Sequence, residues 1–262
     1  MKEDELKYWI WFTQIPRIGL ITRNELLKVY TSPRDIFRAS KNELIEKAGS
    51  RLNSAQLECI LASRLLTRAE TVLSECDRLG ISILTRESAL IKKTIALGNE
   101  TPTLLYVKGK VKELKDTVGI VGARRCTQEI KNFTKYVTEA YVEKGCLIVS
   151  GMAKGVDAYA QTACVNAGGF TVAVLGCGPD ICYPSEHKAL MEEIVQTGLL
   201  VSEYPPGTAP ARYHFPQRNR LIAALSDELV VISAGRGSGA VITADCAGKM
   251  NKPVYFVKSA VQ

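Results

Sequence analysis

Six short apolar runs alternate with helical patterns along residues 117–258, and this rhythm restricts the chain to few folds. The runs are rich in Val, Ile and Leu without polar alternation, which indicates strands buried on both faces. We expect these strands at residues 117–123, 146–151, 170–178, 199–205, 228–235 and 253–258. Helical stretches are expected between them at about 127–144, 155–167, 184–197 and 239–250. The pattern predicts an α/β domain with a doubly wound, mostly parallel sheet.

Residues 1–66 have a different, helical pattern with turn signals at 15–19, 31–35 and 48–51, so three to five short helices fit. The first turn, IPRIG, resembles the hairpin of a SAM-like or helix-hairpin-helix unit, although a plain helical packing domain fits as well. Residues 67–116 contain two predicted strands, 80–85 and 103–109, that extend the sheet or bridge the domains. We therefore expect a helical domain at 1–66 and an α/β domain at 67–262, with 67–116 as its lead-in and 117–262 as its core.

The composition fits a globular protein, because 46% of the residues are hydrophobic. No apolar run approaches the ~20 residues that a membrane span needs, and the N-terminus, MKEDELKYWIWF, lacks a signal-peptide pattern. A cytoplasmic location without membrane contact is expected. The eight cysteines form no C-x-x-C pair, so no metal site is expected. The net charge of +7 permits a nucleic-acid partner without requiring one.

Open α/β sheets bind ligands outside the carboxyl ends of their strands. Three of the predicted strands end in glycine-rich turns that open a helix, at residues 151–155, 176–178 and 235–239. Such turns hold anions because free amides and a partial positive charge meet there. Neither a G-x-G-x-x-G nor a P-loop pattern is present. Seven basic residues fall on the same predicted edge: Arg124, Arg125, Lys154, Arg212, Arg218, Arg220 and Arg236. Together these features predict a positively charged rim.

The sequence offers no catalytic centre that we recognise. It has two histidines, no G-x-S-x-G and no Ser–His–Asp order. Asp157 and Glu203 are the only carboxylates of interest at the predicted edge, and we expect Asp157 to cap a helix or to accept from the amides of the glycine turn. We expect no catalytic residue, no metal and no cofactor.

The stretch HFPQRNRLIAALS, residues 214–226, combines an aromatic side chain with two arginines before an apolar run. Pro216 is expected to start a helix, and Phe215 is a candidate platform for a stacked base. Arg218 and Arg220 would lie about 200° apart on such a helix, so both cannot face one phosphate. We expect Arg218 to point outward and Arg220, with Asn219, to brace neighbouring loops.

Four segments resemble the DNA-processing protein A (DprA/Smf) family, and the resemblance spans essentially all of residues 117–262. They are SGMAKGVDAYAQ, GCGPDICYP, LLVSEYPPGTAPARYHFPQRNRLIAALS and GSGAVITADCAGKMNKPVYFV. The resemblance implies an extended Rossmann-like fold that binds single-stranded DNA and is not an enzyme. It further implies a homodimer that protects incoming strands in natural transformation and recombination and helps to load the RecA recombinase.

The resemblance also implies which residues form the DNA site. They are Arg124, Arg125, Gly151, Met152, Ala153, Lys154, Gly155, Arg212, Phe215, Arg218, Asn219, Arg220, Ser238, Gly239 and Lys249. Replacing Arg124, Arg218 or Arg220 by Ala is expected to weaken DNA binding without unfolding the protein. The chain departs from the family pattern at Gln161, where His is common, and at Lys258-Ser259, where Pro-Gly is common.

Two alternatives have a different function on the same fold. Nucleoside-monophosphate phosphoribohydrolases carry P-G-G-x-G-T-x-x-E after the corresponding strand. Here the stretch is GRGSGAVIT, residues 235–243, with Thr243 where the catalytic glutamate would be. A nucleotide sensor that binds without cleaving is the other alternative, which the glycine turns allow.

Overall fold

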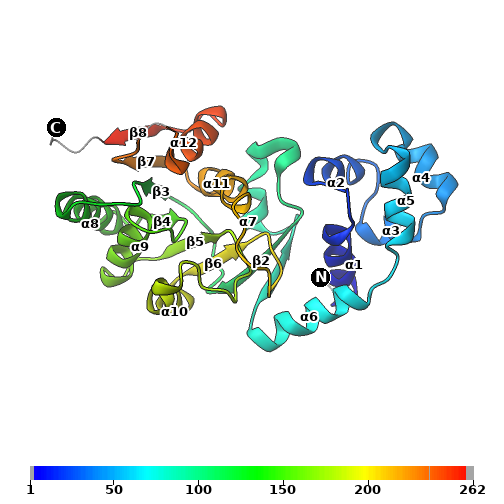
Figure 1. Ribbon diagram of the computed structural model, residues 1–262, viewed down its shortest axis with the longest axis horizontal. Helices are drawn as coiled ribbons and strands as arrows, with labels where there is room; N and C mark the ends of the chain where they lie inside the picture. Colours follow the sequence, from blue (N-terminus) through cyan, green and yellow to red (C-terminus); the bar gives the residue numbers. More distant parts are fainter. Residues whose placement is uncertain (1–2, 236, 258–262) are drawn as a thin grey trace. The chain divides into compact units, whose positions relative to one another are not determined.

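Figure 1 shows a computed structural model of the chain, which describes residues 3–235 and 237–257. The chain divides into two compact units, one that ends at Leu105 and one that begins at Tyr106. No helix within the described residues is long and apolar enough to cross a membrane.

The first unit is mostly helical. Its helices and its strand are α1 (Glu3–Gln14), α2 (Leu20–Leu26), α3 (Pro33–Arg38), α4 (Lys41–Ala48), η1 (Gly49–Arg51), α5 (Ser54–Ala62), α6 (Thr67–Leu79), β1 (Ser82–Thr85), α7 (Ala89–Lys92) and η2 (Ile95–Glu100). The turn predicted at 15–19 falls between α1 and α2, as expected, whereas the one at 31–35 runs into α3 and the one at 48–51 is formed by the end of α4 and by η1. Reciprocal capping pairs, such as Ser40 with Glu43, begin α3, α4 and α5 by satisfying amides of the first turn.

One mostly parallel sheet organises the rest of the fold, with strands in the order β1-β2-β6-β5-β4-β3-β7-β8. The remaining strands are β2 (Leu104–Gly109), β3 (Thr117–Gly122), β4 (Leu147–Ser150), β5 (Thr171–Leu175), β6 (Leu199–Ser202), β7 (Glu228–Ile232) and β8 (Val254–Val257). Strands β3 to β8 pair in parallel, and β2 adds to β6 in the antiparallel direction. The predicted α/β fold is confirmed. Most strands end earlier than expected because their last predicted residues form the turns that carry the site.

Helices cover both faces of the sheet (Figure 1). They are α8 (Gln128–Glu143), α9 (Val156–Asn166), η3 (Ser185–His187), α10 (Lys188–Thr197), α11 (His214–Leu225) and α12 (Gly239–Lys249). Helices α8, α9 and α10 pack on one face of the sheet. There, Val156 and Cys164 of α9 contact Ile120 and Ile148 of the sheet. Helices α11 and α12 pack together on the other face. Helix α11 begins at His214, two residues before the expected start at Pro216, and proline is tolerated there because first-turn amides lack helical partners.

The strand order reverses at β3, which lies between β4 and β7. The chain leaves β3 toward β4 on one side, whereas β7 lies on the other side. The loops after β3 and β7 therefore diverge and leave a crevice at the carboxyl ends of the strands, the usual ligand position in doubly wound folds.

The division into units differs from the domain boundary expected at 66/67. Helix α6 and strand β1 group with the helices, and the division falls within β2. The assignment of residues 67–116 to the α/β domain therefore stays a prediction.

Candidate nucleic-acid interface

A pocket of about 880 Å³ occupies this crevice. Its walls come from the ends of β3, β4 and β7, from the start of α9, from α11 and from the first turns of α12. Eleven of the expected site residues line it: Arg124, Arg125, Gly151, Ala153, Lys154, Arg212, Phe215, Arg218, Asn219, Ser238 and Gly239. The tertiary structure thus gathers, at one sheet edge, residues that lie up to 115 positions apart in the sequence.

Asp157 lies buried at the start of α9, where its carboxylate accepts a 3.2 Å hydrogen bond from the Gly151 amide. The Ala153 amide also donates to it. Burial raises the pKa of Asp157, while the nearby Arg218 charge and these amides act in the opposite direction. The expectation that Asp157 binds amides of the glycine turn is confirmed. The Asp157 carboxylate accepts hydrogen bonds from the Gly151 and Ala153 amides, so these two amides are not free to bind the phosphate of a ligand.

Arg218 is only 4% exposed and faces inward from α11. Its Nη1 donates to the carbonyl of Gly151 at 2.6 Å and to the carbonyl of Val174, and its Nε donates to Asn219 Oδ1 at 3.1 Å. The expectation that Arg218 points outward is therefore wrong. A Cβ at position 151 would lie 2.5 Å from the guanidinium, so any larger residue there would displace Arg218 from these bonds.

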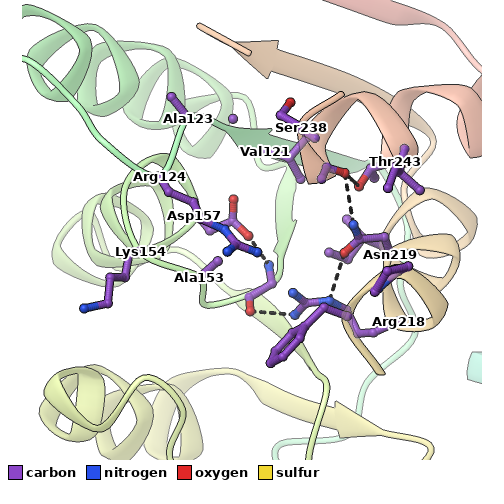
Figure 2. Close-up of a pocket in the computed structure, with 18 of the residues that line it drawn as sticks. Val121, Ala123, Arg124, Ala153, Lys154, Asp157, Arg218, Asn219, Ser238 and Thr243 are labelled. Carbon is purple, nitrogen blue, oxygen red and sulfur yellow. Dashed lines mark hydrogen bonds between the residues drawn. The ribbon is translucent and has the colours of Figure 1, made fainter. Parts of the chain in front are cut away.

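Asn219 continues this network to the opposite wall of the pocket (Figure 2). Its Nδ2 donates to the Gly239 carbonyl at 3.0 Å, and the same carbonyl accepts from Thr243 Oγ1 at 3.1 Å. The chain of hydrogen bonds from Asp157 through Gly151, Arg218 and Asn219 to Gly239 joins α9, the turn after β4, α11 and α12. This hydrogen-bond network thus holds together the turns and helices that line the pocket.

Arg220 also faces inward, and its Nη2 contacts both carboxylate oxygens of Glu203 at 2.7 Å. This pair ties α11 to the loop after β6, so the bracing role expected for Arg220 is confirmed. Arg218→Ala would leave the buried Asp157 and two carbonyls without the guanidinium, and Arg220→Ala would leave the partly buried Glu203 without its partner. Removing one partner of a buried charge pair costs a protein ~3–5 kcal/mol. The expectation that alanine at Arg218 and Arg220 spares the fold is therefore revised.

Exposed cations surround the mouth of the pocket. Among the described residues, Arg124, Arg125 and Arg212 have no carboxylate within 4.0 Å. Lys154 instead pairs with Glu186 at 2.7 Å and points away from the pocket in Figure 2. Its ammonium group lowers the pKa of the Glu186 carboxyl. Arg236 of the expected rim lies outside the described residues.

Aromatic rings stand beside these cations. Phe215 is half-buried, with its ring centroid 5.3 Å from that of Tyr183 and 5.9 Å from Arg218 Cζ. Tyr183 lines the pocket but is not among the site residues expected from the sequence. Only the packing of the loop after β5 onto α11 brings this tyrosine to the pocket.

Four expected site residues do not line the pocket: Met152, Gly155, Arg220 and Lys249. Met152 is fully buried in the core below the turn. Gly155 lies against the Ala123 carbonyl, and a Cβ there would approach that oxygen to 2.1 Å. Lys249 is exposed in the last turn of α12, at the far end of the helix whose first turns line the pocket.

The point where the strand order reverses is the switch point of the sheet. A Rossmann-like α/β domain with a cationic pocket at this point defines a class of anion-binding proteins. Within that class, the model of the DNA recombination-mediator protein A family matches residues 82–262. The chain belongs to this family, so the relationship expected from its motifs is confirmed.

Individual relatives agree with this assignment. Protein Smf of Synechocystis is 33% identical over 99% of this chain and 66% of its own length. DNA processing protein DprA of Streptococcus pneumoniae is 37% identical over 62% of this chain and 57% of its own length. The chain thus spans less than two thirds of these relatives.

Two solved structures are also similar. The X-ray structure of Streptococcus pneumoniae DprA superposes with a TM-score of 0.81 and 27% identity, over 97% of this chain and 87% of that chain. A structure of Helicobacter pylori DNA processing protein A, from work on its single-stranded DNA binding mode, superposes with a TM-score of 0.64 and 32% identity. The match covers 70% of this chain and 82% of that chain. Both likenesses confirm the fold.

Proposed function

We propose that this protein binds single-stranded DNA in the switch-point pocket without preference for base sequence. The observation that carries the proposal is the set of three exposed arginines, Arg124, Arg125 and Arg212, that line the pocket without carboxylate partners among the described residues. Cations that protein carboxylates do not neutralise are available to phosphates, and phosphate contacts supply most of sequence-neutral affinity. The DNA-binding description of the Helicobacter pylori relative supports the proposal.

In this proposal the two layers of the site have separate tasks. The buried hydrogen bonds of Arg218 and Asn219 hold the loops in place, and the exposed arginines contact successive phosphates of the strand. Aromatic side chains at the mouth receive unpaired bases, whose faces are exposed only in single strands. Duplex DNA keeps its bases stacked inside, so it can use the cations but not the rings.

The wider role follows from the family. We propose that binding protects strands during natural transformation and recombination, that the protein works as a cytoplasmic homodimer, and that it helps to load the RecA recombinase. The relatives named DNA processing proteins support this role. We further propose that the protein acts by binding and is not an enzyme.

The nucleotide hydrolase is the weaker candidate. Thr243 lines the pocket where that alternative needs a carboxylate, and its hydroxyl donates to the Gly239 carbonyl. A hydroxyl committed in this way is a poor substitute for a general base. The nucleotide sensor differs from the proposed function in ligand length, so a nucleoside monophosphate that competes fully with an oligonucleotide would favour it.

The decisive experiment is a titration of the protein with a fluorescent oligonucleotide of about thirty bases, single-stranded or annealed to its complement. We expect tighter binding of the single strand and weaker binding after Arg124→Ala or Arg212→Ala. The matched control is Lys135→Ala, which removes one exposed positive charge from α8, away from the pocket. Equal affinity for duplex and single strand, or no binding at low salt, would contradict the proposal.

A further inference from the structure

The ring best placed for a stacked base is not the one expected from the sequence. Phe215 is half-buried: it lies against Gly176, the centroid of the Tyr183 ring lies 5.3 Å from its own, and Arg218 Cζ lies 5.9 Å from its centroid. A base needs an open ring face of its own size to stack on. Phe215 is half-buried whereas Tyr183 is exposed, so Phe215 offers less open ring surface than Tyr183 does.

Tyr183 has the properties that Phe215 lacks. It is 47% exposed, it lines the pocket, and its ring leans on Phe215 at an interplanar angle of 34°. One side of the tyrosine is therefore supported by another aromatic ring while nearly half of the residue remains open to solvent. A ring held in this way loses little side-chain freedom when a ligand stacks on it, which favours binding.

We propose that Tyr183 is the stacking platform for an unpaired base of the bound strand and that Phe215 is a positioning residue that supports the tyrosine ring. This inference rests on the proposed function and names a contact within it. Arg212 lines the same pocket as Tyr183, so a base on the tyrosine ring lies in the pocket that holds the exposed arginines. All four bases have a face that can stack, so this contact adds affinity without base preference.

The arrangement also assigns different effects to the two aromatic residues. Loss of the Tyr183 ring removes the contact with the base directly. Loss of the Phe215 ring leaves the tyrosine in place but less constrained, so the base still stacks, though less completely. The hydroxyl of Tyr183 has no part in the contact, and Phe at this position should serve as well.

The experiment uses the full chain and a single-stranded oligonucleotide that contains 2-aminopurine, whose fluorescence falls when the base stacks on an aromatic ring. We expect Tyr183→Leu and Tyr183→Ala to weaken binding about 5- to 150-fold, the range for one base–aromatic contact, and to abolish most of the protein-induced quenching. Tyr183→Phe should retain both properties. Phe215→Leu should reduce the quenching only in part. Tyr136→Ala, at an exposed tyrosine of α8 outside the pocket, is the matched control.

Each other outcome has a defined meaning. Binding and quenching by Tyr183→Leu equal to those of the wild type would overturn the assignment of Tyr183 alone. Loss of quenching in Phe215→Leu with full quenching in Tyr183→Leu would make Phe215 the platform and would likewise overturn it. If the wild-type protein does not bind the oligonucleotide at low salt, the proposed function fails, and this inference fails with it.

Discussion

At the scale of single residues, the pocket depends on charges that are buried and compensated. The Arg218 guanidinium spans the gap between the Gly151 and Val174 carbonyls, and its positive charge stabilises the buried Asp157 carboxylate. Burial lowers the pKa of Arg218, and Asp157 opposes that effect. Each charge thus makes the burial of the other less costly, and neither is available to a ligand without loss of the network.

We expect Arg218→Ala to lower the free energy of unfolding by about 3–5 kcal/mol, because it leaves Asp157 and two carbonyls buried without their partner. Arg212→Ala is the matched control, since this arginine is exposed and surface substitutions usually change stability by less than about 0.5 kcal/mol. Urea denaturation followed by circular dichroism measures both. Equal stability of the two variants would show that the buried network does not hold the fold together.

At the scale of elements, the turn between β4 and α9 determines how close the loops approach each other. Gly155 has a φ of +83°, and the Val156 amide donates to the Ala123 carbonyl at 3.0 Å. This bond joins the start of α9 to the loop after β3, which carries Arg124 and Arg125. The position of the exposed arginines is therefore set by a glycine that does not itself line the pocket.

We expect Gly155→Ala to lower the free energy of unfolding by roughly 2–4 kcal/mol, because it adds a backbone clash to the strain of a positive φ. Gly168→Ala is the control: its φ is +73°, but no atom lies within 4 Å of the added Cβ. Its cost should be about 1–2 kcal/mol, from the left-handed conformation alone. Similar losses in both variants, measured by urea denaturation, would rule out the close approach as the main cause.

At the scale of the whole molecule, the net charge of +7 says little about affinity for DNA. Many of the basic side chains pair with carboxylates, as Lys154 does with Glu186 and Arg220 with Glu203. What matters is that exposed arginines with no carboxylate partner among residues 3–235 and 237–257 gather at one sheet edge. A local positive field of this kind attracts a polyanion even when the rest of the surface is nearly balanced.

The proposed contacts make a quantitative prediction about salt. Each phosphate of a single strand that the protein neutralises contributes about −0.7 to the slope of log K against log salt concentration. Arg124→Ala should make the slope shallower by about that amount, whereas Lys135→Ala should leave it unchanged. Fluorescence titrations between about 50 and 200 mM KCl measure the slope. An unaltered slope for Arg124→Ala would remove this arginine from the set of phosphate ligands.

The sequence alone predicted the features that depend on local pattern. Continuous Val, Ile and Leu runs identified the buried parallel strands, and the glycine turns located the edge that carries the pocket, because both follow from side-chain burial and backbone geometry along one segment. The helix containing Arg218 and Arg220 was also expected. Its start at His214 instead of Pro216 was not, since a proline is compatible with any position of a first turn.

The directions in which side chains point could not be predicted in the same way. Helical spacing showed that Arg218 and Arg220 diverge, but both directions proved to be buried because α11 packs between the sheet and its neighbouring loops. Likewise, Tyr183 and Phe215 are 32 positions apart, and nothing local indicates that their rings meet.

The sequence by itself thus determined the α/β fold, the family and the sheet edge that carries the candidate site. Only the tertiary structure decided which cations are buried as structural partners and which remain exposed for a ligand. The physical reason is that burial and charge compensation depend on neighbours brought together from distant segments, such as Asp157, Gly151 and Val174 around Arg218. The burial of a strand follows from its own composition, whereas a charged side chain is buried or exposed according to which residues pack against it.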